Sequence, residues 1–168
     1  MSNVFTDDYD EVDSKMGRMS GDNTEELVAW WMEGNADFFG ALYSRDAEGF
    51  KYEMRCALEC TGPFSVSRKD KFFDEGLKLR NISWDQGDLV DLGYRLGSWF
   101  VAYLTSVHGE QALYDFWETV DEMDFEATFL RQFGVDYRTY LDEFEVWLRN
   151  PNEDLLAILD DIYASKAR

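Results

Sequence analysis

The sequence has few of the residues that interrupt long regular elements. It contains two Pro among 168 residues, against thirteen Phe, nine Tyr and six Trp. A sandwich of short strands joined by Pro-rich turns is therefore disfavoured, and long uninterrupted elements are favoured. With 45% hydrophobic residues the chain has ample material for one core. The expected fold class is all-α.

Histidine is scarcer still, since His108 is the only one. A zinc site of the H-E-x-x-H type needs two imidazoles one helical turn apart, so the chain cannot assemble a complete zinc hydrolase site from its own residues. His108 precedes Gly109, a position typical of a helix end, where a His interacts with the helix dipole. Nucleophilic catalysis by a Ser, His and Asp set lacks support as well. Phosphate-binding loops of the G-x-x-x-x-G-K-(S/T) and G-x-G-x-x-G types are also missing.

The two cysteines, Cys56 and Cys60, do not form a recognisable metal motif. They are four positions apart in a segment that reads as helix, where an intrahelical disulfide is geometrically awkward. A structural zinc site would need a second pair of ligands. We expect two small buried thiols.

Positive charge is outnumbered two to one, because 16 Lys and Arg face 35 Asp and Glu and give a formal net charge of -19. This charge repels phosphates and anionic lipids, so we expect no direct nucleic acid binding and no membrane binding. It is consistent with solubility in a salty milieu, with attraction to a basic partner, or with imitation of a nucleic acid. No apolar run reaches the roughly 18 residues of a membrane span. The start MSNVFTDDYDEVDS has no signal region, so the chain is expected to be cytoplasmic as written, whereas a longer parent could be secreted.

Apolar periodicity predicts one domain. Residues 1–22 read as a loosely ordered acidic lead-in, and residues 23–168 as a helical domain. A turn carrying Trp84 is expected at 81–87. Gly and Pro residues mark the helix ends. The result is a bundle of about seven to eight helices, predicted at 24–43, 47–60, 68–79, 89–108, 110–120, 125–133, 137–148 and 152–164.

The stretch WWMEGNADFF at 30–39 places Glu33 in a helix beside two Trp. A partly buried carboxylate needs a partner or a metal, and a structural ion pair or a cap is the ordinary interpretation. The stretch resembles the W-x-x-E-G-x-A-x-(Y/F) segment of gluzincin-type zinc metallopeptidases, in which this Glu is the third zinc ligand. Tyr94 begins a Tyr-Arg-Leu-Gly segment that is similar to the Y-x-x-G setting of the same family. The resemblance implies that Tyr94 is the catalytic oxyanion donor of a completed site.

The resemblance spans about residues 28–149 and implies the C-terminal helical subdomain of a gluzincin. Its H-E-x-x-H helix is absent, and two explanations remain open. The motif has decayed in place, with Glu11 as a degenerate base and Asp10 and Ser14 where imidazoles belong. Alternatively, the chain is a truncated portion whose zinc helix lies upstream. Either explanation predicts no peptidase activity and no cofactor in this chain, with zinc bound by Glu33 only if an upstream helix supplies the histidines.

The functional prediction is therefore a non-catalytic helical domain resembling the C-terminal part of a zinc metallopeptidase, either truncated or degenerate. The alternative is an acidic helical interaction protein that imitates nucleic acid and binds a basic partner. A domain that lacks half of its fold leaves an apolar patch, and such patches are commonly covered by association. We therefore expect a protein partner or a homo-oligomer.

Overall fold

The computed structural model describes residues 29–120 and 122–166, and within these ranges it is an all-α bundle without strands. The predicted lead-in at 1–22 lies outside the described residues. Each of the eight predicted helices has a counterpart. The α-helices are α2 (Ala29–Ser44), α3 (Ala47–Glu59), α4 (Arg68–Asp74), α5 (Val90–His108), α6 (Glu110–Thr119), α7 (Phe125–Phe133), α8 (Tyr137–Trp147), α9 (Asn152–Leu156) and α10 (Ile158–Ser165), with 3-10 turns η1 (Leu79–Asn81) and η2 (Gly87–Leu89).

Several helices begin at a side chain that accepts a hydrogen bond from the first turn. Asp46 accepts from the Gly49 amide at 2.8 Å at the start of α3, and Asp124 accepts from the Ala127 amide at 2.8 Å at the start of α7. Such caps satisfy amide groups that have no partner inside the helix. The short helices are thus delimited by local sequence.

Two predicted helices differ from the structure in extent. The predicted 68–79 helix ends at Asp74, because Gly76 takes φ +64° and turns the chain toward η1. The predicted 152–164 helix is divided at Ala157 into α9 and α10. Ala157 keeps helical angles of φ -59° and ψ -29°, so the chain passes between the two without leaving the helical region.

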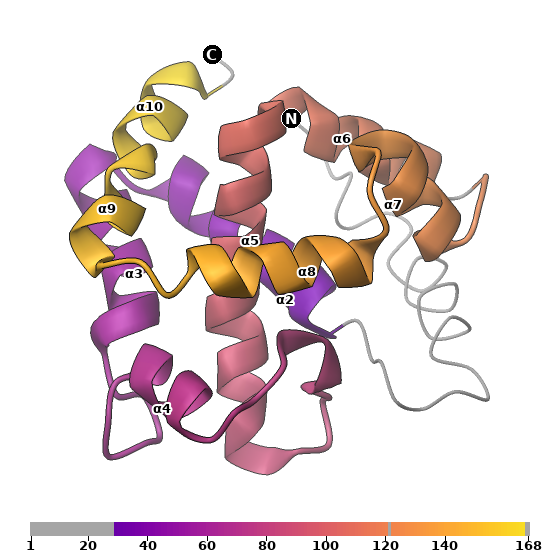
Figure 1. Cartoon of the computed structure of the whole chain (residues 1–168). Coiled ribbons are helices and arrows are strands. Elements are labelled where there is room, and N and C mark those ends of the chain that lie inside the picture. Colours follow the sequence, from indigo (N-terminus) through magenta and orange to yellow (C-terminus); the bar gives the residue numbers. More distant parts are fainter. Residues whose placement is uncertain (1–28, 121, 167–168) are drawn as a thin grey trace.

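Helix α5 is the central element of the bundle. In Figure 1 it runs through the middle of the molecule, with α2 behind it and α8 across its front. It also contacts α3, α4, α6 and α10. Trp99 and Phe100 on this helix are fully buried, as is Phe116 on α6, and Trp117 on α6 is nearly so. These aromatic side chains therefore belong to the core of the bundle.

A close helix contact joins α2 and α5 at two glycines. A Cβ on Gly97 would lie 2.2 Å from the Trp30 carbonyl oxygen, and a Cβ on Gly34 would lie 2.4 Å from the Gly97 carbonyl carbon. No side chain fits into such distances, so the two backbones touch directly. Gly34 is therefore buried against α5.

Large aromatic side chains fill the space around this contact. The Trp30 and Trp31 rings are fully buried and meet Phe100 edge-on, with ring centroids 5.6 and 6.2 Å apart. Phe116 and Phe129 surround Trp31 at 4.8 and 5.6 Å. Edge-to-face packing at these separations adds to the gain from burying apolar area. The core of the domain is thus centred on α2 and α5.

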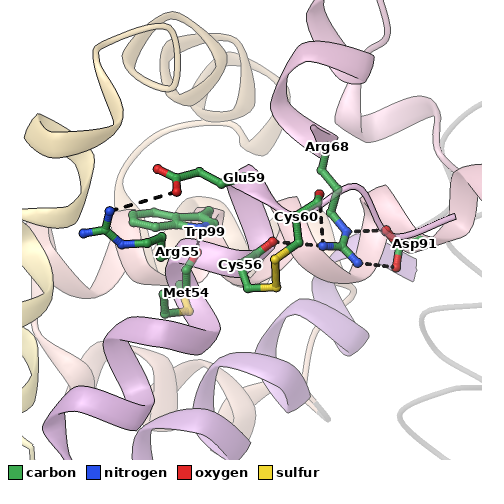
Figure 2. The surroundings of a disulfide bond; sticks show 8 residues. All are labelled: Met54, Arg55, Cys56, Glu59, Cys60, Arg68, Asp91 and Trp99. Atoms are coloured by element: carbon green, nitrogen blue, oxygen red, sulfur yellow. Dashed lines mark hydrogen bonds and ion pairs between the residues drawn. A yellow bond between two sulfur atoms is a disulfide. The ribbon is translucent and has the colours of Figure 1, made fainter. Parts of the chain in front are cut away.

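The two cysteines form a disulfide, so the expectation of free thiols was wrong. Figure 2 shows the bond at the end of α3. Cys60 is the C-cap of that helix, with extended angles of φ -71° and ψ 148°, and its Cα lies 4.7 Å from that of Cys56. The geometric objection applied to two cysteines within a helix, whereas only Cys56 is inside it.

Arg68 holds the same helix end from the other side. Its Nη1 donates to the carbonyl oxygens of Cys56 at 2.9 Å and Cys60 at 3.3 Å, and its Nε donates to Asp91 Oδ2 at 2.5 Å. Figure 2 shows this guanidinium between the helix end and Asp91, which lies at the start of α5. The arginine side chain is nearly buried, so these bonds are shielded from water. Arg68 therefore fixes the end of α3 to α5.

The glycine contact makes a direct prediction about stability. Gly97→Ala should lower the free energy of unfolding by about 1–3 kcal/mol or more, because its methyl group has to displace backbone atoms. Gly40→Ala on α2 is the matched control. A Cβ there meets nothing within 4 Å, so higher helix propensity should stabilise the protein by up to about 1 kcal/mol. Urea unfolding of both variants measures the difference, and equal effects would contradict the contact.

The disulfide is tested by counting thiols in the denatured chain with and without reductant. We expect none before reduction and two after it. Because the closed loop is short, reduction should lower the free energy of unfolding by about 2 kcal/mol. A Cys56→Ser, Cys60→Ser double variant is the control and should be insensitive to reductant. Two reactive thiols in the unreduced chain would show that the bond does not form.

Candidate functional site

Glu33 on α2 and Tyr94 on α5 are brought together by the helix contact. Glu33 directly precedes Gly34, and Tyr94 lies one turn before Gly97, so both side chains leave the two helices beside the point where the backbones touch. Each is half-buried. The Tyr94 hydroxyl acts on the Glu33 carboxylate as a hydrogen-bond donor. The two residues singled out in separate sequence motifs thus share one site.

Trp84 is a third member of the site, and sequence reasoning placed it only in a turn. The turn packs on α5 through Ile82, whose Cγ2 would lie 3.2 Å from a Cβ on Gly93, next to Tyr94. The Trp84 indole also acts on Glu33, because its N–H lowers the pKa of the carboxyl. Its side chain remains 39% exposed, so one edge of the site is open to solvent.

The environment of Glu33 favours its neutral form. Burial is the main cause that raises the pKa of this carboxyl above its ordinary value, and the negative charge of Asp37 raises it further. Hydrogen bonding from Tyr94 and Trp84 acts in the opposite direction. A cation placed at Glu33 would relieve both unfavourable contributions.

Asp37 follows Glu33 by one helical turn and pairs with Arg95, whose Nη1 lies 3.1 Å from Asp37 Oδ2. Burial raises the pKa of Asp37 although Arg95 opposes the shift, and Asp91 adds to it. The Asp37–Arg95 pair was missed from the sequence. Only tertiary packing places Arg95 against α2, and no local motif indicates it.

The other residues considered from the sequence are Glu11, with its neighbours, and His108. Glu11, with Asp10 and Ser14, lies outside the described residues. His108 closes α5 as expected for a helix-end His, and its Nε2 lies 2.7 Å from the Tyr140 hydroxyl. Burial lowers the pKa of His108. It therefore contacts α8 through Tyr140.

The described residues do not fit a zinc ion by themselves. Across 29–120 and 122–166, no cluster of three or more His, Cys, Asp or Glu side chains is arranged to hold a metal. Glu33 offers one carboxylate, and the sequence has no pair of imidazoles to add to it. A catalytic zinc needs three protein ligands.

The surface carries the acidic excess on many elements. Exposed Asp and Glu side chains occur on α3, α4 and each helix from α6 to α10. Exposed large apolar side chains also come from different elements, as with Tyr52 on α3, Leu130 on α7 and Val146 on α8. Within the described part of the chain, no helix combines the length and the apolar character needed to cross a membrane. The basic partner and the homo-oligomer stay predictions.

Comparison with known proteins finds no matching family model, no matching curated protein and no matching solved structure. The site described above therefore depends on its own geometry for interpretation.

The raised pKa of Glu33 predicts how stability changes with pH. A carboxyl whose pKa is higher in the folded state binds its proton more tightly there, so folding stability falls as pH rises from about 4.5 through the folded pKa. Glu33→Gln removes that loss. The melting temperature of Glu33→Gln, relative to that of the wild type, should therefore rise as pH increases from about 4 to 8.

The exposed Glu118→Gln variant controls for removing one negative charge from the surface. A Glu33→Gln advantage that stays constant or shrinks as pH rises would contradict the assignment of a half-buried, destabilised carboxylate.

Proposed function

We propose that this chain is a C-terminal helical part of a gluzincin-like zinc metallopeptidase, truncated or degenerate, and non-catalytic by itself. The observation that carries the proposal is the placement of Glu33 beside Tyr94 by the contact of Gly34 with Gly97. In the family that the sequence resembles, these two positions hold the third zinc ligand and the oxyanion donor.

The spacing inside each motif has a physical reason in this fold. In the E-G motif the glycine directly follows the carboxylate, and in the Y-x-x-G motif it follows the phenol by one turn. Both glycines lie at the backbone contact, where a larger residue would separate the helices. The motifs therefore pair a functional side chain with the residue that positions it. This supports the family relationship more strongly than either short motif alone.

The chemistry available in this chain is limited to one half of such a site. A carboxylate and a phenol can bind a cation and donate one hydrogen bond to a substrate oxygen. Activation of water needs the imidazoles that hold a metal and a general base, which the H-E-x-x-H helix provides in this class of site. In a longer or associated protein, Glu33 is the residue we expect at the metal and Tyr94 the one we expect at the substrate oxygen.

The disulfide bears on where such a protein folds. Structural disulfides form and persist in oxidising compartments. The Cys56–Cys60 bond therefore supports a secreted parent more than the cytoplasmic location expected from the chain as written.

The first experiment reads the coding DNA upstream of the Met1 codon for an in-frame H-E-x-x-H, and then isolates the longer product. If the motif is present, the longer protein should bind one zinc ion, and Glu33→Gln should lose it. Tyr94→Phe should keep the zinc and lower kcat by about 100-fold or more, because one oxyanion donor is removed. Absence of the motif selects the degenerate explanation over the truncated one.

The chain itself provides the control. Titration with Zn²⁺ should give the same result for the wild type and for Glu33→Gln, since one carboxylate does not hold zinc tightly. Tight zinc binding by this chain that depends on Glu33, or a longer protein in which Glu33→Gln leaves the zinc content unchanged, would contradict the proposal.

A further inference from the structure

A cavity of about 210 Å³ lies between α2, α3 and α5, one turn beyond Glu33 along α2. Charged side chains from these three helices, and from the linker between α2 and α3, border the cavity. Asp37 and Arg95 face each other across one side, and Arg45 and Glu53 across another. The cavity is open to solvent, and it belongs neither to the aromatic core nor to the Glu33–Tyr94 pair.

The charges in this cavity balance, unlike those of the chain as a whole. Two guanidinium groups and two carboxylates converge, with Arg95 Nη1 3.1 Å from Asp37 Oδ2 and Arg45 Nη2 3.5 Å from Glu53 Oε1. In a protein of net charge -19, an anionic group meets general repulsion and is accepted only where cationic donors are concentrated. The side chains remain 27–56% exposed, so a ligand can reach them from the solvent.

Small residues keep the floor of the cavity free. Gly40 lies at the exposed surface of α2, and a Cβ there would meet nothing within 4 Å. Ala36, Ala41 and Ala57 also line the space, and Met54 provides an apolar wall. A ligand of a few atoms fits above Gly40, with its ammonium and carboxylate groups directed to the charged pairs.

We propose that this cavity binds a small zwitterion, namely the ammonium and carboxylate groups of a free amino acid or a short peptide. The ligand carboxylate lies against the guanidinium groups of Arg95 and Arg45, and the ammonium lies against Asp37 and Glu53. Guanidinium groups suit carboxylates because they donate parallel hydrogen bonds. The assignment does not depend on the metallopeptidase relationship.

The state of Asp37 supports the site for the ammonium group. Burial raises the pKa of this carboxyl, and the nearby Asp91 and Glu53 add to the shift, so Arg95 alone does not compensate it. A second cation at Asp37 favours the charged carboxylate.

The test follows the Gly40 and Arg95 amide signals by NMR while alanine or alanyl-alanine is added. Both signals should shift saturably with at least one of the two. N-acetylalanine lacks the ammonium and alaninamide lacks the carboxylate, so each should bind at least about tenfold more weakly than the tighter-binding of the two zwitterions. Tighter binding of alanine indicates a free amino acid as ligand, and tighter binding of the dipeptide indicates a peptide.

Two variants locate the binding. Gly40→Leu should abolish it by filling the cavity, while its helical circular dichroism and melting temperature show that the fold is retained. Ala164→Leu on exposed α10 is the matched control and should bind as the wild type does. The proposal is overturned if neither zwitterion gives a saturable shift, if the blocked derivatives bind equally well, or if folded Gly40→Leu still binds.

Discussion

The direct contact between the backbones of α2 and α5 is the constraint on which the other features depend. Gly34 and Gly97 approach so closely that a single methyl group at either position would collide with main-chain atoms. Helices normally pack with side chains interleaved between them, at interaxial distances of about 8–10 Å. Here the absence of side chains at one point lets the neighbours on either side meet. On one side the buried Trp30 and Trp31 rings reach Phe100, and on the other side Glu33 reaches Tyr94.

Much of the helical pattern was accessible from the sequence because its signals are local. Apolar periodicity identified each helix, and stops such as Gly109 and Gly134, which take φ of +83° and +75°, ended α5 and α7 near their predicted ends. The exceptions are also local in origin. Gly76 ends α4 early, and Cys60 is a cap rather than a helical residue, a difference of one position that decides whether a disulfide with Cys56 is geometrically accessible.

The candidate site was accessible only in part. Glu33 and Tyr94 were identified because each lies in a short motif, and the glycines of those motifs also create the contact that joins them. Trp84 lies in no motif, and Arg95 occupies a position that the Y-x-x-G motif leaves unspecified. Their roles arise only when the 81–87 turn and one face of α5 pack beside α2. Local sequence patterns do not contain this tertiary arrangement. The same applies to Arg68, which lies in no sequence motif and is the buried link between α3 and Asp91.

The electrostatics of α2 explain why a ligand or partner at this face should be cationic or zwitterionic. Glu33 and Asp37 lie one turn apart, both partly withdrawn from water, and both have pKa values raised by that burial. Each carboxylate therefore costs more folding free energy than a surface one, and neither cost is fully offset by Tyr94, Trp84 and Arg95. Coulomb interactions strengthen as the surroundings become less polar, so a positive charge gains more here than at the exposed acids elsewhere on the surface. The unfavourable state of these two carboxylates is consistent with a position prepared for a positive charge in addition to that of Arg95.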